Sequence, residues 1–252
     1  MDYNKLHQYS TGEDIVIALI DSGISEFQVE QINKNVEKST DESIYDINGH
    51  GTMMCSILLG YNNEIVGIAP NAKINSYKVV GEDGTINGDN LANAIIEANN
   101  DNVDIINISL GNFHSNKKVK KAIDAATDDG IIVIASSGDY EAEDMLFPAN
   151  QENVISVGAI DKNKNIWQNT NDYESCDILA PGVDILVINN NQKIFSSTGT
   201  SQATAIISGY VSLILSYAKK NECNIDYNYI LEKIHKISNG KSTYLNELIN
   251  IK

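Results

Sequence analysis

Arginine is absent from this chain, and basic residues of any kind are scarce. The 252 residues include 18 lysines against 34 aspartates and glutamates, which gives a formal net charge of -16 and a pI near 4.5. Nucleic acids and anionic membranes would be repelled by such a field, so we expect neither as a partner. A cationic peptide would instead be attracted.

Cysteine is also rare and occurs only as Cys55, Cys176 and Cys223. An odd number of cysteines in a chain of this size implies no disulfide framework and favours a reducing compartment. The amino terminus lacks a basic segment followed by an apolar run, and no stretch approaches the roughly 18 apolar residues of a membrane span. We therefore expect a cytoplasmic protein without an export signal or anchor. A secreted protein is the alternative if the chain is a trimmed mature domain.

The apolar content of 42% and the chain length are sufficient for one large core, and we expect a single domain over residues 1–252. Apolar runs alternate with amphipathic stretches, which is typical of a doubly wound α/β fold whose mostly parallel sheet has helices on both faces. The expected strands are 15–20, 74–80, 103–109, 131–135 and 154–157. The expected helices between them are 51–59, 88–99 and 117–128.

Residues 161–197 have a different pattern, because short apolar pieces there are separated by Pro-Gly and Asn-rich turns. We expect short antiparallel strands and loops in this region. From Thr200 the chain is apolar and rich in small residues for about twenty positions, which predicts a buried central helix. Two amphipathic helices are expected after it, at 226–235 and 243–250.

Three short motifs carry candidate chemistry, each at the boundary of an expected element. Asp21 ends an apolar strand, His50 lies between glycines at the opening of a helix, and Ser201 follows Gly-Thr at the start of the buried helix. An aspartate at a strand end is commonly structural, a solitary histidine usually packs or lies on the surface, and Gly-Thr-Ser is often a helix cap. Each motif alone is weak, and only their combination indicates an active site.

In that combination the chain resembles the subtilisin family of serine peptidases. The order Asp, His, Ser is the order found in that family, and segments 66–70, 75–80, 106–111 and 180–183 match further family motifs in order and spacing. The resemblance implies that Ser201 is the nucleophile, His50 the general base and Asp21 the carboxylate that orients the base. It also implies a peptide or protein substrate, an acyl-enzyme intermediate and chemistry without a cofactor. We expect the protein to act as a monomer.

The resemblance further implies a substrate groove between two walls, in which an extended peptide completes the sheet. One wall is an edge strand and the other a turn that pairs with the peptide from the opposite side, while Gly138 lies near the scissile bond. The wall residues are Ser109, Leu110 and Gly111 on one side and Gly81, Glu82, Asp83 and Gly84 on the other. Glu82 and Asp83 lie in one wall, and Glu141, Glu143 and Asp144 follow the segment of the expected oxyanion hole, so we expect a preference for basic or polar substrate side chains, although such charge clusters are more often simply solvated surface.

One position of the expected oxyanion hole departs from the family pattern. The family's asparagine corresponds here to Asp139, and an ionised carboxylate can accept hydrogen bonds but cannot donate one. Asp139 could donate in a protonated form, because burial beside negative charge raises the pKa of a carboxyl group. It could instead turn away and leave the Ser201 amide and the Thr200 hydroxyl as donors. The third alternative is a slow or silent relative that only binds peptides.

A structural calcium site and an esterase activity are both less well supported by the sequence. Residues 61–65 look trimmed relative to relatives whose loop at this place holds calcium, so we expect a surface turn and regard a structural calcium ion as doubtful. An α/β hydrolase acting on esters is disfavoured, because its G-x-S-x-G elbow and its order Ser, Asp, His are both missing.

Overall fold

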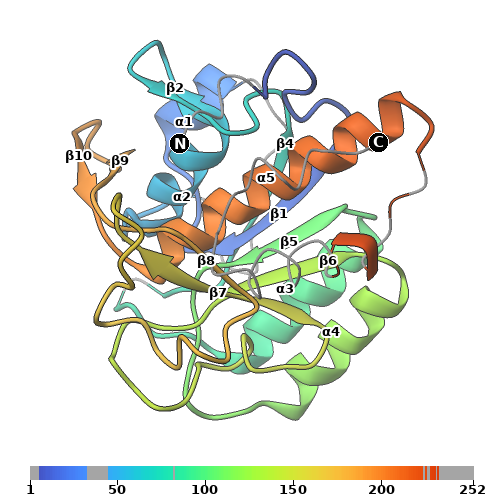
Figure 1. Ribbon diagram of the computed structural model, residues 1–252, viewed down its shortest axis with the longest axis vertical. Coiled ribbons are helices and arrows are strands. Elements are labelled where there is room, and N and C mark those ends of the chain that lie inside the picture. The colour runs from blue at the N-terminus through green and yellow to red at the C-terminus, as the bar shows by residue number, and fades with distance from the viewer. Residues whose placement is uncertain are drawn as a thin grey trace.

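A six-stranded sheet forms the centre of the molecule, with the strand order β4-β1-β5-β6-β7-β8 (Figure 1). The computed structural model describes residues 6–32, 45–81, 83–223, 225, 228–230 and 232. The strands of the sheet are β1 (Val16–Asp21), β4 (Lys73–Lys78), β5 (Ile105–Ile108), β6 (Ile132–Ser136), β7 (Val154–Ile160) and β8 (Ile178–Pro181). All neighbouring strands are parallel, which confirms the doubly wound α/β fold.

Helices cover both faces of this sheet. The helices α2 (His50–Leu59) and α5 (Thr200–Lys220) pack on one face, and α3 (Gly88–Asn100) and α4 (Lys117–Asp128) on the other (Figure 1). Leu19 of β1 belongs to the core cluster that includes α2 and α5, whereas its neighbour Ile20 belongs to the cluster formed with α3 and α4. Because successive side chains point to opposite faces of a strand, a sheet covered on both faces requires continuous apolar runs.

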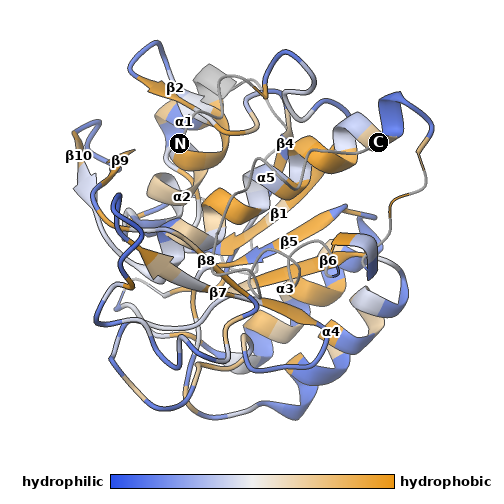
Figure 2. Ribbon diagram, in the orientation of Figure 1, coloured by the Kyte–Doolittle hydropathy of each residue, from blue (hydrophilic) through white to orange (hydrophobic). Residues whose placement is uncertain are grey.

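The hydropathy of the elements follows this layered arrangement. The strands are hydrophobic over most of their length in Figure 2, while the outer side of α4 is hydrophilic. The buried residues of α4 are Val119, Ala122, Ile123 and Ala126, which have the spacing of a helix with one apolar face. In contrast, α5 has buried residues along almost its whole length. It is therefore the buried central helix that the sequence predicts.

The region 161–197 differs in part from the sequence-based expectation. It contains β8, which joins the main sheet in parallel, and only β9 (Ile185–Ile188) and β10 (Ile194–Ser197) form an antiparallel pair. Since β8 is four residues long and is followed by a Pro-Gly turn, its local pattern does not reveal its direction. A short helix, α1 (Glu26–Ile32), follows β1 and was not expected.

The carboxyl-terminal helices fall mainly outside the described residues. In the expected helix 226–235, residues 228–230 and 232 are described and are helical, while 243–250 lies outside the described ranges. In the part of the chain that the structure describes, no helix combines the length and the apolarity needed to cross a membrane.

Candidate active site

The carboxyl ends of parallel strands meet at one edge of a sheet, and Asp21 lies at this edge as the last residue of β1. Only 1% of its side chain is exposed, and its Oδ1 accepts a hydrogen bond of 2.7 Å from the Ser22 amide. His50 is the first residue of α2, and its Nδ1 lies 2.8 Å from Oδ1 and 3.0 Å from Oδ2 of Asp21. Nδ1 therefore donates to the carboxylate, which leaves Nε2 as the basic nitrogen of the neutral ring.

A second buried carboxylate, Asp46, holds the start of α2 in place. One of its oxygens accepts hydrogen bonds from the Gly49 amide (2.7 Å) and the Ser22 hydroxyl (2.9 Å). The other accepts bonds from the Thr52 amide (2.8 Å) and the Thr52 hydroxyl (2.6 Å). Negative charge at a helix start satisfies free amides and complements the helix dipole. The sequence-based analysis missed Asp46, although an acidic residue shortly before a helix opening is a signal for such a cap.

Surrounding carboxylates raise the pKa of His50 above its ordinary value of 6.5. Burial alone would lower it, because a charged imidazolium is poorly solvated there. The charge of Asp21, its hydrogen bond to the ring and the charges of Asp46 and Asp139 together outweigh that effect. The site thus stabilises an imidazolium, as it must if His50 takes a proton during a reaction.

Ser201 is the second residue of α5, the element that leads back through the core of the molecule. Its hydroxyl donates a hydrogen bond of 2.9 Å to the main-chain oxygen of Ser109, which follows β5. The hydroxyl of Ser109 in turn donates to the main-chain oxygen of Ser201 at 3.2 Å. These two reciprocal bonds tie the start of α5 to the end of β5.

A buried polar chain extends this connection into the core. The side-chain amide of Asn107 donates to the Ser109 hydroxyl at 3.0 Å, and its carbonyl oxygen accepts a bond of 2.9 Å from the Ser208 hydroxyl. Asn107 and Ser208 are both fully buried, so each polar atom in this chain needs its partner. The position of Ser201 relative to β5 is therefore fixed from inside the protein.

The carboxylate of Asp139 contacts the first turn of α5. Its Oδ1 accepts hydrogen bonds from the Thr200 amide (2.9 Å) and the Thr200 hydroxyl (2.6 Å). The same hydroxyl oxygen accepts the amide of Gly138 at 3.2 Å. Because the only hydroxyl proton of Thr200 is given to Asp139, this hydroxyl is not a free donor for an oxyanion. The other oxygen of Asp139, Oδ2, lies beside Gly199, 2.7 Å from the place a Cβ would occupy there.

A buried asparagine that the sequence-based analysis missed, Asn171, arranges the loop after Asp139. Its side-chain oxygen accepts the amides of Tyr140 (2.8 Å) and Ala142 (3.2 Å), and its main-chain amide donates to Gly138 at 3.0 Å. Gly138 has a φ of +113°, and a Cβ at this position would lie 2.6 Å from the Asn171 side chain. This close approach requires glycine. No local pattern marks Asn171, because it acts on a segment thirty residues away.

One hollow is lined by residues of the first expected wall and by a residue close to the second. Leu110 and Gly111 line a hollow of about 200 Å³ together with Ile86, which follows the expected second wall. That wall is a closed turn, in which the Gly81 amide donates to Thr85 at 2.9 Å and Val80 pairs with Ile86. Asp83 lies in the turn and accepts both the amide and the hydroxyl of Thr85. Glu82 lies outside the described residues.

Leu146 occupies the space between Gly111 and Gly138. A Cβ on Gly111 would lie 2.9 Å from the Leu146 Cβ, and one on Gly138 would lie 2.7 Å from its Cγ. The side chain is 6% exposed and therefore fills this gap. Above it, the rings of Phe113 and Tyr140 contact each other at a centroid distance of 5.6 Å, with half or more of each residue exposed.

The segment in which calcium was considered is a small hairpin. Gly60 pairs with Val66 and Tyr61 with Ile65, and the Glu64 amide closes the turn onto the Tyr61 oxygen at 3.2 Å. Calcium takes six to eight oxygen ligands, and so short a turn offers few. Among the described residues there is also no group of three or more His, Cys, Asp or Glu side chains that could hold a metal ion.

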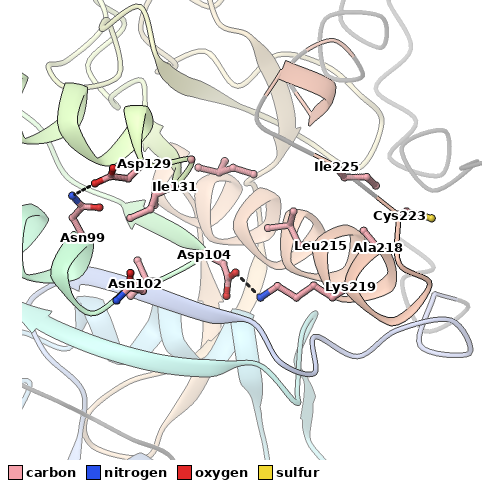
Figure 3. A pocket seen from close by; sticks show the side chains of 13 residues that line it. Asn99, Asn102, Asp104, Asp129, Ile131, Leu215, Ala218, Lys219, Cys223 and Ile225 are labelled. Carbon is pink, nitrogen blue, oxygen red and sulfur yellow. Dashed lines mark hydrogen bonds and ion pairs between the residues drawn. The ribbon is translucent and has the colours of Figure 1, made fainter.

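A larger hollow, of about 620 Å³, lies at the opposite edge of the sheet (Figure 3). Asp104 and Gly130 line it just before β5 and β6, so it lies at the amino ends of the strands. Lys219 forms an ion pair with Asp104 at 2.6 Å, and the side chains of Asn99 and Asp129 are hydrogen-bonded at 2.8 Å. Size alone does not make this hollow the active site, because Asp21, His50 and Ser201 all lie elsewhere.

Comparisons with known proteins agree with this geometry. The sequence model of the subtilase family matches residues 12–233. Over 207 residues the chain is 32% identical to subtilisin BL of Lederbergia lenta, a match that covers 81% of this chain and 77% of that protein. It is likewise 32% identical to an alkaline protease of Alkalihalobacillus alcalophilus, with 81% of this chain and 54% of that protein covered. The chain thus spans about half the length of this second relative.

The fold is also that of a solved maturation protease. The structure of the prenylagaramide maturation protease PagA superposes with a TM-score of 0.85 at 26% identity, and covers 98% of this chain and 97% of that one. The parallel sheet, the order of the three site residues and the family match define the class of protein. The chain belongs to the subtilase family of serine endopeptidases.

Proposed function

We propose that this chain is an endopeptidase in which Ser201 attacks a peptide carbonyl, His50 takes the serine proton and Asp21 orients the imidazole. The contact between Asp21 and His50 carries this proposal. The buried Asp21 carboxylate accepts a hydrogen bond from Nδ1 of His50 at 2.8 Å, so the proton of the neutral ring stays on Nδ1 and Nε2 is free to accept another. In addition, 29% of the His50 side chain is exposed. The raised pKa of His50 supports its role as the proton acceptor.

The Ser201 hydroxyl is bonded to the Ser109 oxygen and must rotate to give its proton to His50. We propose that the substrate itself drives this change. A peptide pairing with the edge after β5 offers its own amide to Ser109, since an added strand bonds through its main chain. The serine hydroxyl then loses its acceptor and turns to the Nε2 atom of His50.

The start of α5 supplies stabilisation for the oxyanion in this proposal. The Ser201 amide lies in the first turn of the helix, where main-chain amides and the dipole favour negative charge. Asp139 adds no donor while it is ionised, and its charge opposes that of the oxyanion. We propose that it serves as an anchor for Thr200 and that turnover is slower than a donor at this position would allow.

We propose an extended, specific peptide as the substrate, bound between Ile86 and the Leu110–Gly111 edge. The likeness to a protein described as a maturation protease supports a role in the maturation of one peptide or protein. The gap filled by Leu146 lies between two backbone segments beside Ser201, so we propose that it limits the size of the residue before the scissile bond. The Leu146 side chain lies close to both Gly111 and Gly138 and leaves little depth between them.

The compartment and the oligomeric state are proposals as well. Cys55 is buried, Cys176 half-buried and Cys223 exposed, and no disulfide joins them. Cysteines without disulfides are typical of a reducing compartment, which supports a cytoplasmic location. We propose that the protein acts as a monomer and needs no cofactor for its chemistry.

Labelling with a fluorophosphonate, followed by mass mapping, tests the proposed function. The reagent should modify Ser201 of the wild-type protein and no residue of the Ser201→Ala variant. A separate His50→Ala variant should also remain unmodified, because its Ser201 lacks the base that activates it. A folded wild-type protein that remains unlabelled would support the alternative of a peptide-binding relative without catalysis.

A further inference from the structure

We propose that a hollow formed in part by the loop that follows Asp139, which we term the acidic hollow, binds a lysine or arginine side chain of the substrate. This inference rests on the proposed function, because it assigns a second contact to the same peptide. The hollow has a volume of about 520 Å³ and lies between residues 141–143 and 166–174. Its charged and aromatic lining residues are Glu141, Glu143, Asp172, Glu174, Trp167 and Tyr173.

Four carboxylates and two aromatic rings line this one space. No lysine or histidine is among its lining residues. Within the part of the chain that the structure describes, none of the four carboxylates forms an ion pair with a lysine. The hollow therefore presents negative charge that the protein does not neutralise, and a positively charged group is the complementary occupant.

The aromatic residues distinguish an organic cation from a metal ion. Trp167 is half-buried against the main core, Tyr173 is 42% exposed, and Ile166 beside them is 41% exposed. A lysine or arginine side chain can lay its aliphatic stem on such a surface, while its charged end interacts with ring faces and carboxylates. A divalent ion would gain nothing from the rings, and these carboxylates do not form a metal-binding group.

Main-chain hydrogen bonds join the two walls of the hollow to each other. The Glu141 amide donates to the Asn169 oxygen and the Asp172 amide to the Ala142 oxygen, each at 2.9 Å. These bonds fix the two walls relative to each other. The first wall follows Asp139 directly along the chain, and Asp139 is bonded to Thr200 beside the proposed nucleophile. The hollow thus begins two residues after Asp139, and the proposal places in it a side chain of a peptide bound in the groove.

Tryptophan fluorescence provides a direct test, because Trp167 is the only tryptophan of the chain. The whole Ser201→Ala protein is titrated with acetyl-trilysine amide at low salt, and with the same peptide carrying acetylated lysines. We expect a saturable change in emission with the charged probe and none with the acetylated one. Higher salt should weaken the binding. No spectral change with the charged probe would overturn the proposal.

Matched variants separate the acidic hollow from the general negative field of the protein. The double substitution Glu141→Gln with Glu143→Gln should weaken the affinity for the charged probe about three- to tenfold, which is the range expected for the loss of two exposed charge contacts. The control is Glu64→Gln with Glu152→Gln, which changes the net charge equally at exposed sites elsewhere. Equal weakening in both proteins would show that the probe senses only overall charge.

A second variant keeps the test conclusive if the first does not fold. The double substitution Asp172→Asn with Glu174→Gln removes charge from the opposite wall of the hollow and should weaken the affinity for the probe by a similar factor. In the active protein, the preference in kcat/KM for a lysine peptide over its acetylated form should fall with the affinity. A fluorescence response without any turnover would sink the proposed function alone, whereas turnover without a response would sink the acidic hollow alone.

Discussion

The two edges of the central sheet are built from similar residues but have different consequences. At the amino ends, Asp104 pairs with Lys219, which is 48% exposed, so both charges are neutralised near water. At the carboxyl ends, Asp21 is buried and its neighbour is a histidine whose pKa it raises. An aspartate thus forms an ordinary ion pair at one edge and, at the other, raises the pKa of the histidine that we propose as the proton acceptor. Burial and the type of partner, rather than the residue itself, make the difference.

The largest expected effect comes from changing the aspartate at the carboxyl edge. Asp21→Asn should lower kcat roughly 10⁴-fold, as the same change does in the well-studied serine protease triad, because an amide no longer fixes the tautomer of His50. Asp104→Asn at the amino edge is the matched control and should leave kcat unchanged. Steady-state kinetics on a cleaved peptide measures both. A mild effect at Asp21 would mean that another group orients the imidazole.

A gain of activity is expected at Asp139. In an Asp139→Asn variant, the side-chain oxygen can keep the bonds to Thr200, while an NH₂ group replaces the free oxygen beside Gly199. This removes a negative charge and adds a donor, so kcat should rise by up to roughly 10²-fold. Single-turnover rates of the two proteins provide the comparison. A variant no faster than the wild type would show that this carboxylate lies outside the oxyanion hole.

The same substitution should also move the pH profile. Wild-type kcat/KM should rise with pH through a midpoint above 6.5, because His50 acts in its neutral form and its pKa is raised. Asp139 is one of the charges that favour the imidazolium, so removing it lowers the pKa of His50. The midpoint in Asp139→Asn should accordingly lie at lower pH than in the wild type. An unchanged midpoint would contradict the electrostatic contact between the two residues.

A smaller change is expected from widening the gap beside Ser201. Leu146→Ala removes the side chain between Gly111 and Gly138, and should raise kcat/KM for phenylalanine relative to alanine before the scissile bond about tenfold. Unfolding should become easier by about 2–5 kcal/mol, since the residue is buried. Paired peptides that differ only at that residue give the ratio. If the ratio stays constant, Leu146 does not limit this subsite.

The smallest effect should follow from breaking the ion pair at the amino edge. Lys219→Met should lower the free energy of unfolding by at most about 1 kcal/mol, because exposed ion pairs contribute little. It should leave kcat/KM within experimental error of the wild type. Urea unfolding and peptide kinetics on the same preparation measure the two quantities. A loss of activity would mean that the edges are coupled through the sheet.

The sequence predicted the elements with strong patterns and missed those without one. Five of the six parallel strands in the main sheet and the helices 51–59, 88–99 and 117–128 were expected within three residues of their actual ends, because continuous apolar runs and clear helical spacing mark them. The direction of β8 was missed, since a strand's partners are set by the fold rather than by its four residues. The short α1 was missed because seven residues give too few turns for a period to emerge.

The same distinction applies to the candidate site. Asp21, His50 and Ser201 lie in short motifs that can be recognised in one dimension. Asn171 acts on a loop thirty residues away, and Leu146 matters only because two distant glycines flank it. Such contacts have no local signature. The bonds of Asp139 to Thr200 also required three-dimensional information, although the replacement itself was visible in the sequence.

The burial of α5 has a consequence for how the protein moves. Almost every position of this helix is covered by the sheet or by α2, so its amides should exchange with solvent only when the domain unfolds as a whole. The main chain of Ser201 is part of this slow element, so movement of the serine during a catalytic cycle is limited to rotation of its side chain. Any opening and closing that accompanies turnover then belongs to the surface loops. Control over this protein would have to act by obstructing the groove, since the main chain of Ser201, the proposed nucleophile, stays where the core holds it.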